Sequence, residues 1–165
     1  MSAWRHLRAI ALLPGLAAIG VPALILLGSG TSVGWGRDGF AAVLPVILGA
    51  ALIAAGFVLW LWTVILLARV GGGTLAPWDP TSRLVAVGPY RRLRNPMITA
   101  VLAVLAGEAA LFGSPQLAIW CAAFLLLNHA FFVVYEEPAM ERRFGEEYRA
   151  YAREVPRWLP RVSSR

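Results

Sequence analysis

Residues 40–68 read FAAVLPVILGAALIAAGFVLWLWTVILLA and contain no charged side chain. A helix needs about 20 consecutive apolar residues to cross the hydrocarbon core of a bilayer, so this run is longer than a perpendicular span requires. Tilt or an interfacial extension must absorb the excess, and Trp60 and Trp62 are typical of residues at a membrane boundary. The run indicates that lipid is the solvent of this protein.

The composition of the whole chain agrees with a membrane protein. Of its 165 residues, 59% are hydrophobic and only 15% are charged, whereas a soluble domain carries about 25% charged residues. Three more apolar runs occupy residues 9–28, 96–112 and 116–135. The sequence therefore predicts an all-α, polytopic membrane protein that forms a single domain over residues 1–165, with about four spanning helices.

The arginines predict how these spans are oriented. All fifteen basic residues are arginines, and all except Arg37 lie before the first run, in the long loop 69–95 or in the tail 136–165. Four spans place these three regions on one side of the membrane, and basic residues concentrate on the cytoplasmic side. We therefore expect the loop, the tail and both termini to be cytoplasmic.

Charge and cysteine usage exclude several classes of partner. The net charge of +6 is spread between apolar runs, which favours contact with anionic lipid headgroups over nucleic acid. Cys121 is the only cysteine and lies within an apolar run, so no disulfide within the chain is expected. His129 has no second histidine at ligand spacing, and we expect no metal site.

Polar residues inside the apolar runs are candidates for function. Glu108 lies in the third run, and an acid at the middle of the bilayer costs about 2.5–3.5 kcal/mol on insertion scales. It serves either a functional site or a hydrogen bond between helices. In the fourth run, His129 lies seven residues before Glu136, so one helix face would present both. That face predicts a polar pocket, or a simple contact of His129 with another helix.

The tail 136–165 contains seven arginines and six glutamates, most of which we interpret as a solvated, ion-paired face. The exceptions are Glu136 and Glu137, which lie beside Pro138, where the helix should end or kink. Phe144, Tyr148, Tyr151 and Val155 follow at spacings of four, three and four, which predict an amphipathic helix at the membrane interface.

Residues 88–96 read GPYRRLRNP and combine a glycine-proline turn, three guanidinium groups and the start of a helix. Such a segment suits an anion or a carboxylate. An ordinary loop next to the membrane has the same features, and the segment alone does not separate the two.

Taken together, GPYRRLRNP, an apolar hairpin and YEEPAMERRFGEEYRAYAREVPRWLP at residues 135–160 resemble the isoprenylcysteine carboxyl methyltransferases and their phospholipid N-methyltransferase relatives. The resemblance spans residues 88–160. It implies an S-adenosylmethionine-dependent methyltransferase built from membrane helices, acting on a lipophilic substrate that arrives through the bilayer. Two departures stand out: Ile98 replaces a frequent tyrosine, and residues 132–135 lack an arginine that many members carry as a substrate-carboxylate partner.

The resemblance also implies a cytoplasmic cofactor pocket. Residues 88–96 and the two adjacent acids would line it, while residues 140–151 and 155–160 would close it. Glu136 or Glu137 would bind the cofactor's amino group or ribose hydroxyls, Tyr90 would stack on adenine and Arg94 would hold a carboxylate. The full set of expected cofactor-binding residues is Gly88, Tyr90, Arg94, Asn95, Pro96, His129, Glu136, Glu137 and Tyr148.

Methyl transfer from a sulfonium to a carboxylate needs no base, so holding the two reactants about 3–3.5 Å apart in a dry site supplies most of the catalysis. An amine acceptor requires a base, for which Glu108 and His129 are the candidates; with Arg94 they form the expected catalytic set. A thiol acceptor stays open as well. Two rival hypotheses remain: an NADPH-dependent reductase, since membrane sterol reductases share a similar Phe-Gly-x-x-Tyr-x-x-Tyr pattern, and a scaffold without catalysis.

Overall fold

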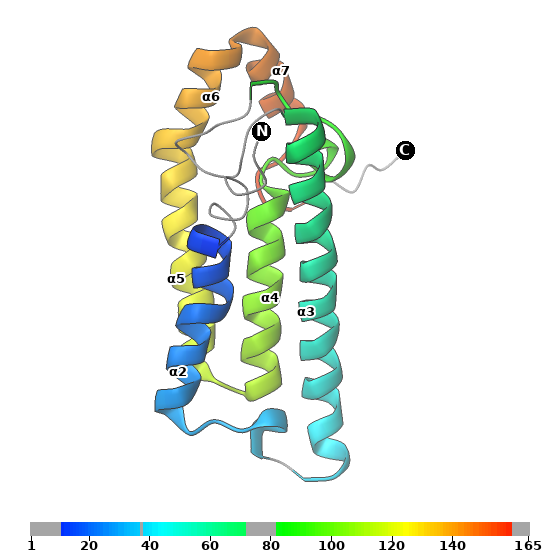
Figure 1. The fold of residues 1–165 in the computed structure, drawn as a ribbon, viewed down its shortest axis with the longest axis vertical. Helices are drawn as coiled ribbons and strands as arrows, with labels where there is room; N and C mark the ends of the chain where they lie inside the picture. The colour runs from blue at the N-terminus through cyan, green and yellow to red at the C-terminus, as the bar shows by residue number, and fades with distance from the viewer. Residues whose placement is uncertain (1–10, 37, 72–81, 160–165) are drawn as a thin grey trace.

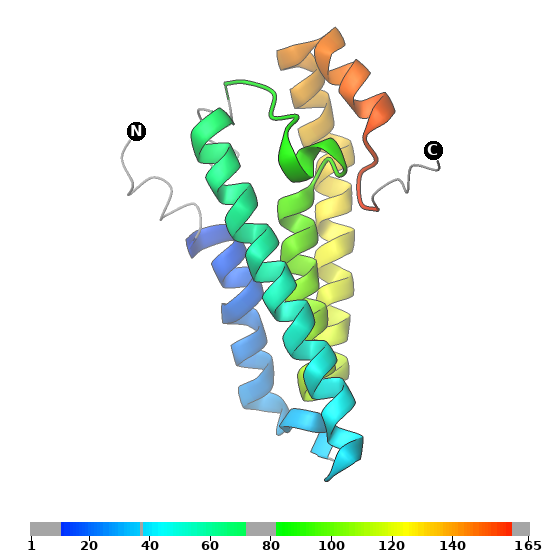
Figure 2. The ribbon, with the colours of Figure 1, turned by 90° about the vertical axis from the view of Figure 1, so that its right-hand side faces the viewer.

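A computed structural model describes residues 11–36, 38–71 and 82–159, and within these ranges the chain is helical with no strand. Helical rods run side by side along the long axis of the molecule (Figures 1 and 2). They are formed by η1 with α2 (Ala11–Gly20 and Val21–Ser29), α3 (Phe40–Leu66) with η3 (Leu67–Gly71), α4 (Pro96–Phe112), and α5 (Pro115–Phe131) with η5 (Phe132–Glu136) and α6 (Glu137–Phe144). The short helices η2 (Val33–Gly36), η4 (Gly88–Arg91) and α7 (Glu146–Glu154) cover the two ends of the rods.

Three of the described helices are long and apolar enough to cross a membrane: Pro14–Gly36, Phe40–Gly71 and Pro115–Phe144. The fourth, α4, is apolar but has only 17 residues, which is near the lower limit of about 17 for a spanning helix. The prediction of an all-α polytopic membrane protein is confirmed.

Glycines bring α3 and α4 into close contact. A Cβ atom added to Gly49 would stand 2.7 Å from the carbonyl oxygen of Gly107, and one added to Gly56 would stand 2.7 Å from that of Ala100. Both distances are far shorter than a van der Waals contact between carbon and oxygen. No residue larger than glycine therefore fits at these positions without separating the helices. Thr63, one further heptad along α3, is fully buried and donates its hydroxyl to the carbonyl of Trp60.

The opposite end of the bundle is closed by Trp35. Its indole N–H donates to the carbonyl of Ala110 at 2.6 Å, and its ring lies against Gly113, where an added Cβ would stand 2.5 Å from Trp35 Cγ. Gly113 has φ +58° and ends α4. Ser114 caps the next helix by accepting from the backbone N–H of Leu117. The turn between α4 and α5 is therefore capped by Ser114 and covered by Trp35.

The sequence predicted that the helix ends or kinks at Pro138, and in the structure it does not end there. Pro138 lies in the first turn of α6, and the turn before it is π-helical, with the N–H of Glu137 donating to the carbonyl of Phe132. The helix ends instead at Gly145, whose φ of +56° and ψ of −128° favour glycine. The expected amphipathic helix is α7, which is shorter than the pattern from Phe144 to Val155: Phe144 ends α6, on the other side of the corner at Gly145, and Val155 is extended and buried.

Candidate active site

Glu137 is the centre of a charged cluster made by three separate segments. Its Oε1 lies 3.0 Å from Nη1 of Arg94, which precedes α4, and 2.6 Å from Nε of Arg157, which follows α7. Nη2 of Arg157 also donates to Oε2 at 2.8 Å. Arg157 therefore binds both carboxylate oxygens in a bidentate geometry, which makes arginine–carboxylate pairs strong. The cluster is largely withdrawn from solvent, with 21% of the Glu137 side chain and 15% of the Arg94 side chain exposed.

Backbone contacts hold the C-terminal segment against residues 88–96. The N–H of Arg94 donates to the carbonyl of Pro156 at 2.9 Å. The Tyr151 hydroxyl donates to the carbonyl of Tyr90 at 2.7 Å. The loop before α4 and the chain after α7 are thus joined by hydrogen bonds as well as by the ion pairs on Glu137.

His129 is tied to the same C-terminal segment. The indole N–H of Trp158 donates to Nδ1 of His129 at 3.1 Å, and the Trp158 ring lies 5.7 Å from that of the buried Phe132. Because Nδ1 is the acceptor, a neutral His129 carries its proton on Nε2 and offers a donor there. His129 accepts a proton only after the bond to Trp158 breaks.

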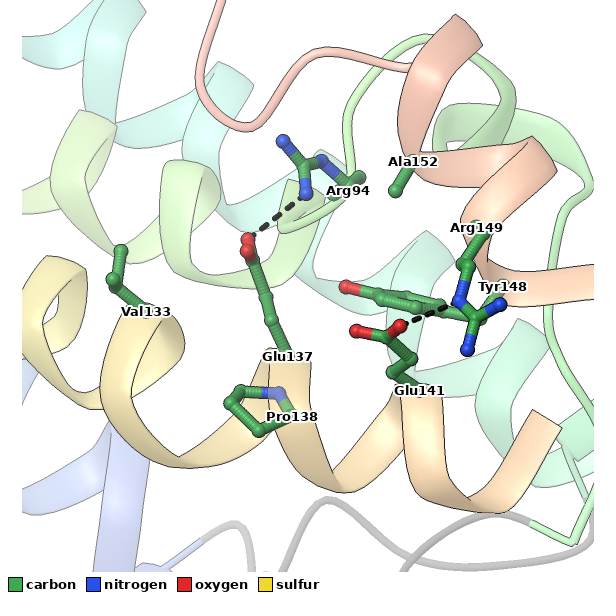
Figure 3. Close-up of a pocket in the computed structure, with 8 residues that line it drawn as sticks. All are labelled: Arg94, Val133, Glu137, Pro138, Glu141, Tyr148, Arg149 and Ala152. Atoms are coloured by element: carbon green, nitrogen blue, oxygen red, sulfur yellow. Dashed lines mark hydrogen bonds and ion pairs between the residues drawn. The ribbon is translucent and has the colours of Figure 1, made fainter. Parts of the chain in front are cut away.

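A pocket of about 290 Å³ opens beside Glu137, between the α5–α6 helix and α7 (Figure 3). This is close to the lower end of the range of about 300–1,000 Å³ for small-molecule sites. Its walls combine apolar side chains with groups of both charges: Arg94, Val133, Glu137, Pro138, Glu141, Tyr148, Arg149 and Ala152. Across its mouth, Nε of Arg149 lies 2.5 Å from Oε1 of Glu141. The pocket suits a ligand that is both charged and partly apolar.

The tyrosines around the pocket are kept protonated. Burial, and then the carboxylate of Glu137, raise the pKa of Tyr148 above its usual value. Burial is also the main cause that raises the pKa of Tyr90, with smaller contributions from Tyr151 and the nearby carboxylate of Glu136. Phenols in this state donate hydrogen bonds at physiological pH.

Two buried donors at the site have no partner among the described residues: Nε of Arg94 and Nδ2 of Asn95. A buried donor without an acceptor costs about 1–3 kcal/mol, which a bound acceptor group would recover. Asn95 directly precedes Pro96, the buried first residue of α4. Both donors thus lie where the loop passes into the bundle.

The structure brings most of the expected site residues together. Arg94, Glu137 and Tyr148 line the pocket, whereas Tyr90, Asn95, Pro96, His129 and Glu136 lie around it without lining it. Gly88 instead faces α3, because a Cβ there would stand 2.8 Å from Cδ1 of Leu66. Glu108 stands apart: it follows Pro96 by twelve residues, or about 18 Å along α4. One of its buried oxygens has no partner among the described residues.

Two residues at the site were expected only as part of the closing segment 155–160 and were not named individually as site residues. Arg157 and Trp158 lie in the tail, where most arginines were interpreted as a solvated face. The available signal was Val155-Pro156-Arg157, a proline-bearing segment directly after the tyrosine pattern. Nothing in that spacing identifies Glu137, which lies 20 residues away, as the partner of Arg157.

The fold and the site define a helical membrane protein with a polar pocket at the end of its spans. The sequence profile of the phospholipid methyltransferase family matches residues 44–147. Since the match covers more than half of the 165-residue chain, the protein belongs to the phospholipid methyltransferase family, which is related to the isoprenylcysteine carboxyl methyltransferases and confirms the predicted resemblance. Arg157 and Trp158 lie beyond the matched residues. Comparisons with curated proteins and with solved structures found no significant match.

Proposed function

We propose that this protein is an S-adenosylmethionine-dependent methyltransferase that modifies a lipid acceptor, either a carboxylate or an amine, at the cytoplasmic surface of the membrane. The observation that carries the proposal is the convergence of residues 88–96, Glu137 and the segment after α7 on one pocket, within a family of methyltransferases. That pocket lies where the spanning helices end, so an acceptor anchored in the bilayer reaches it without leaving the lipid.

The residues of the pocket fit the cofactor. S-adenosylmethionine carries a carboxylate, an ammonium and a sulfonium, and the pocket presents guanidinium and carboxylate groups beside apolar side chains. Nε of Arg94 and Nδ2 of Asn95, which have no partner among the described residues, are free to donate hydrogen bonds to such a ligand. When bound, the cofactor supplies a methyl group that is displaced in line from its sulfonium.

The roles of individual residues follow from their partners. Both oxygens of Glu137 already accept from arginines, so this residue positions the loop and the tail. Glu136 forms no ion pair with any described residue and lies near Tyr90, which leaves its carboxylate for a ligand ammonium or for hydroxyls. Arg94 uses Nη1 on Glu137 and keeps Nε for a ligand carboxylate. Tyr148 contributes a protonated phenol.

The choice of acceptor depends on proton handling. A carboxylate acceptor is already ionised and needs only positioning and exclusion of water. An amine acceptor must lose a proton, and His129 is better placed for this than Glu108 because Trp158 joins it to the site. To accept this proton on Nδ1, His129 would first have to break the hydrogen bond that it receives from Trp158.

Ligand binding tests the proposal against the reductase and scaffold hypotheses. We expect calorimetric titration of the detergent-purified full chain to show binding of S-adenosylhomocysteine and none of NADPH. Binding of NADPH alone would favour the reductase, and binding of neither ligand would favour a scaffold. Incubation with methyl-labelled S-adenosylmethionine and membrane lipid extracts should then place the label in a lipid fraction.

A further inference from the structure

A groove of about 740 Å³ lies between α3 and residues 88–93, and no residue lines both this groove and the pocket beside Glu137. Leu59 and Trp62 of α3 form one wall. Gly88, Pro89, Arg91, Arg92 and Leu93 form the other. The groove is more than twice as large as that pocket, and the proposed function does not use it.

The wall opposite α3 is firmly held. Gly88 has φ +57°, and an added Cβ there would stand 2.8 Å from Cδ1 of Leu66 and 3.4 Å from Cζ2 of Trp62. Pro89 and Leu93 are buried, which anchors both ends of the short helix η4. Arg91 and Arg92, between these anchors, are exposed. Two adjacent guanidinium groups are thus presented from a fixed backbone.

These two arginines differ from the others near them. Arg94, Arg149 and Arg157 each form an ion pair with a glutamate. Within the described ranges, neither Arg91 nor Arg92 forms one. The groove therefore carries two uncompensated positive charges.

The opposite wall is apolar and lies at membrane level. Trp62 is 51% exposed and belongs to the candidate span Phe40–Gly71, in its last third. An exposed tryptophan at the end of a span is typical of the headgroup region. Arginines beside such a residue meet lipid phosphates, whereas α3 below them meets acyl chains.

We propose that this groove binds the phosphate of an anionic phospholipid, with an acyl chain lying against Leu59 and Trp62. Two unpaired guanidinium groups match a phosphate that carries a net negative charge, and guanidinium–phosphate contacts are strong when bidentate. A zwitterionic lipid brings its own positive group and gains less from the pair. The bound lipid acts as a fixed ligand of η4, the helix that precedes Arg94, and is not itself the methyl acceptor.

The test uses the full chain in detergent, titrated with phosphatidylglycerol whose acyl chains are brominated, because bromine quenches a tryptophan that it contacts. The chain has seven tryptophans, so the quenching that is lost in Trp62→Phe reports the groove. We expect tighter binding of brominated phosphatidylglycerol than of brominated phosphatidylcholine. The double variant Arg91→Gln with Arg92→Gln should weaken phosphatidylglycerol binding about tenfold or more.

The matched control is Arg142→Gln with Arg143→Gln, which removes two exposed arginines of α6 that do not line the groove. This variant should bind phosphatidylglycerol as the unchanged protein does. Circular dichroism and size-exclusion profiles must match for all variants. Equal affinity for the two lipids, unchanged binding in the Arg91 and Arg92 variant, or displacement by inorganic phosphate as effective as by unlabelled phosphatidylglycerol would overturn the proposal. The assay contains no methyl donor, so its outcome is independent of the proposed enzyme activity.

Discussion

At the scale of single residues, Glu136 and Glu137 are adjacent in sequence but have different surroundings. Glu137 accepts three hydrogen bonds from two arginines that belong to distant segments. Removing its charge leaves two guanidinium groups close together with no carboxylate between them, which is unfavourable in a partly buried place. Glu136 has no ion pair among the described residues, so its carboxyl group is available to a ligand.

We predict that Glu136→Gln with Glu137→Gln abolishes S-adenosylhomocysteine binding while the protein remains folded and inserted. The single variants should separate the two roles: Glu137→Gln lowers stability by about 1–3 kcal/mol through lost charged hydrogen bonds, and Glu136→Gln weakens binding without this loss. Calorimetry and thermal unfolding measure the two effects. Glu147→Gln, an exposed acid of α7, should change neither. Unchanged affinity in the double variant would remove both acids from the site.

Tyr151 gives a second prediction at this scale. Tyr151→Phe removes the hydrogen bond to the carbonyl of Tyr90 and should cost about 0.5–1.5 kcal/mol of stability. Thermal unfolding in detergent at neutral pH measures this difference. Tyr135→Phe serves as the control, because Tyr135 is exposed and its hydroxyl has no partner among the described residues. A Tyr151→Phe variant as stable as the unchanged protein would show that the bond contributes nothing.

The buried tyrosines also predict a dependence on alkaline pH. Burial raises the pKa of Tyr90, Tyr148 and Tyr151 above the usual value of about 10. The folded protein therefore holds these protons to higher pH than the unfolded chain does. Their contribution to stability is complete below about pH 10 and is lost as the pH rises above it. We expect the midpoint temperature of thermal unfolding, measured from pH 8 to 11, to decrease once the pH exceeds about 10. The decrease should be less steep in Tyr151→Phe.

At the scale of elements, the crossing of α3 and α4 determines where the site residues stand. Gly88 packs against Leu66 at the end of α3, and residues 88–95 lead from there to the start of α4. Their position therefore depends on how closely the two helices approach. Gly49, Gly56 and Gly107 allow that approach. Widening it would shift residues 88–95 and so displace Arg94 from its present position.

Gly56→Ala tests the crossing, because the new methyl group would stand 2.7 Å from the carbonyl oxygen of Ala100. We expect a loss of about 1–3 kcal/mol from overpacking, together with weaker S-adenosylhomocysteine binding. Gly28→Ala is the matched control, since nothing lies within 4 Å of its added Cβ. That control should be neutral or slightly stabilising, as alanine favours a helix over glycine by about 1 kcal/mol. Equal stability of the two variants would contradict the close contact.

At the scale of the whole molecule, the rods alternate in direction, and their ends divide into two kinds. One end carries the turn at Gly113 with Trp35 against it. The other carries η4, α6, α7 and every described ion pair (Figures 1 and 2). From the positive-inside rule we propose that the second end is cytoplasmic.

Single-cysteine labelling tests this topology. In a Cys121→Ala background, a membrane-impermeant maleimide should label Glu147→Cys only from the cytoplasmic side and Ser32→Cys only from the opposite side. Both positions are exposed. Labelling of the two positions from the same side would contradict the proposed orientation of the spans.

Much of the fold was predictable from local properties of the sequence. Hydropathy over 20 or so residues marks a spanning helix wherever its neighbours lie, so residues 40–68, 96–112 and 116–135 predicted the all-α membrane bundle. The motif around Arg94 and the acids at 136–137 likewise indicated the family, and Arg94 and Glu137 both line the pocket.

Tertiary structure alone decided the rest, because it depends on which distant groups meet. Pro138 did not end its helix: it lies in the first turn of α6, directly after a π-helical turn, and the helix ends at Gly145 instead. Arg157 reaches Glu137, and Trp158 reaches His129, only because the chain after α7 folds back over the bundle. Glu108, an acid of the same chemical type, lies too far along α4 to join them. The sequence determines which residues are charged and how they are spaced along each helix. Which charged residues become partners is determined by how the helices pack.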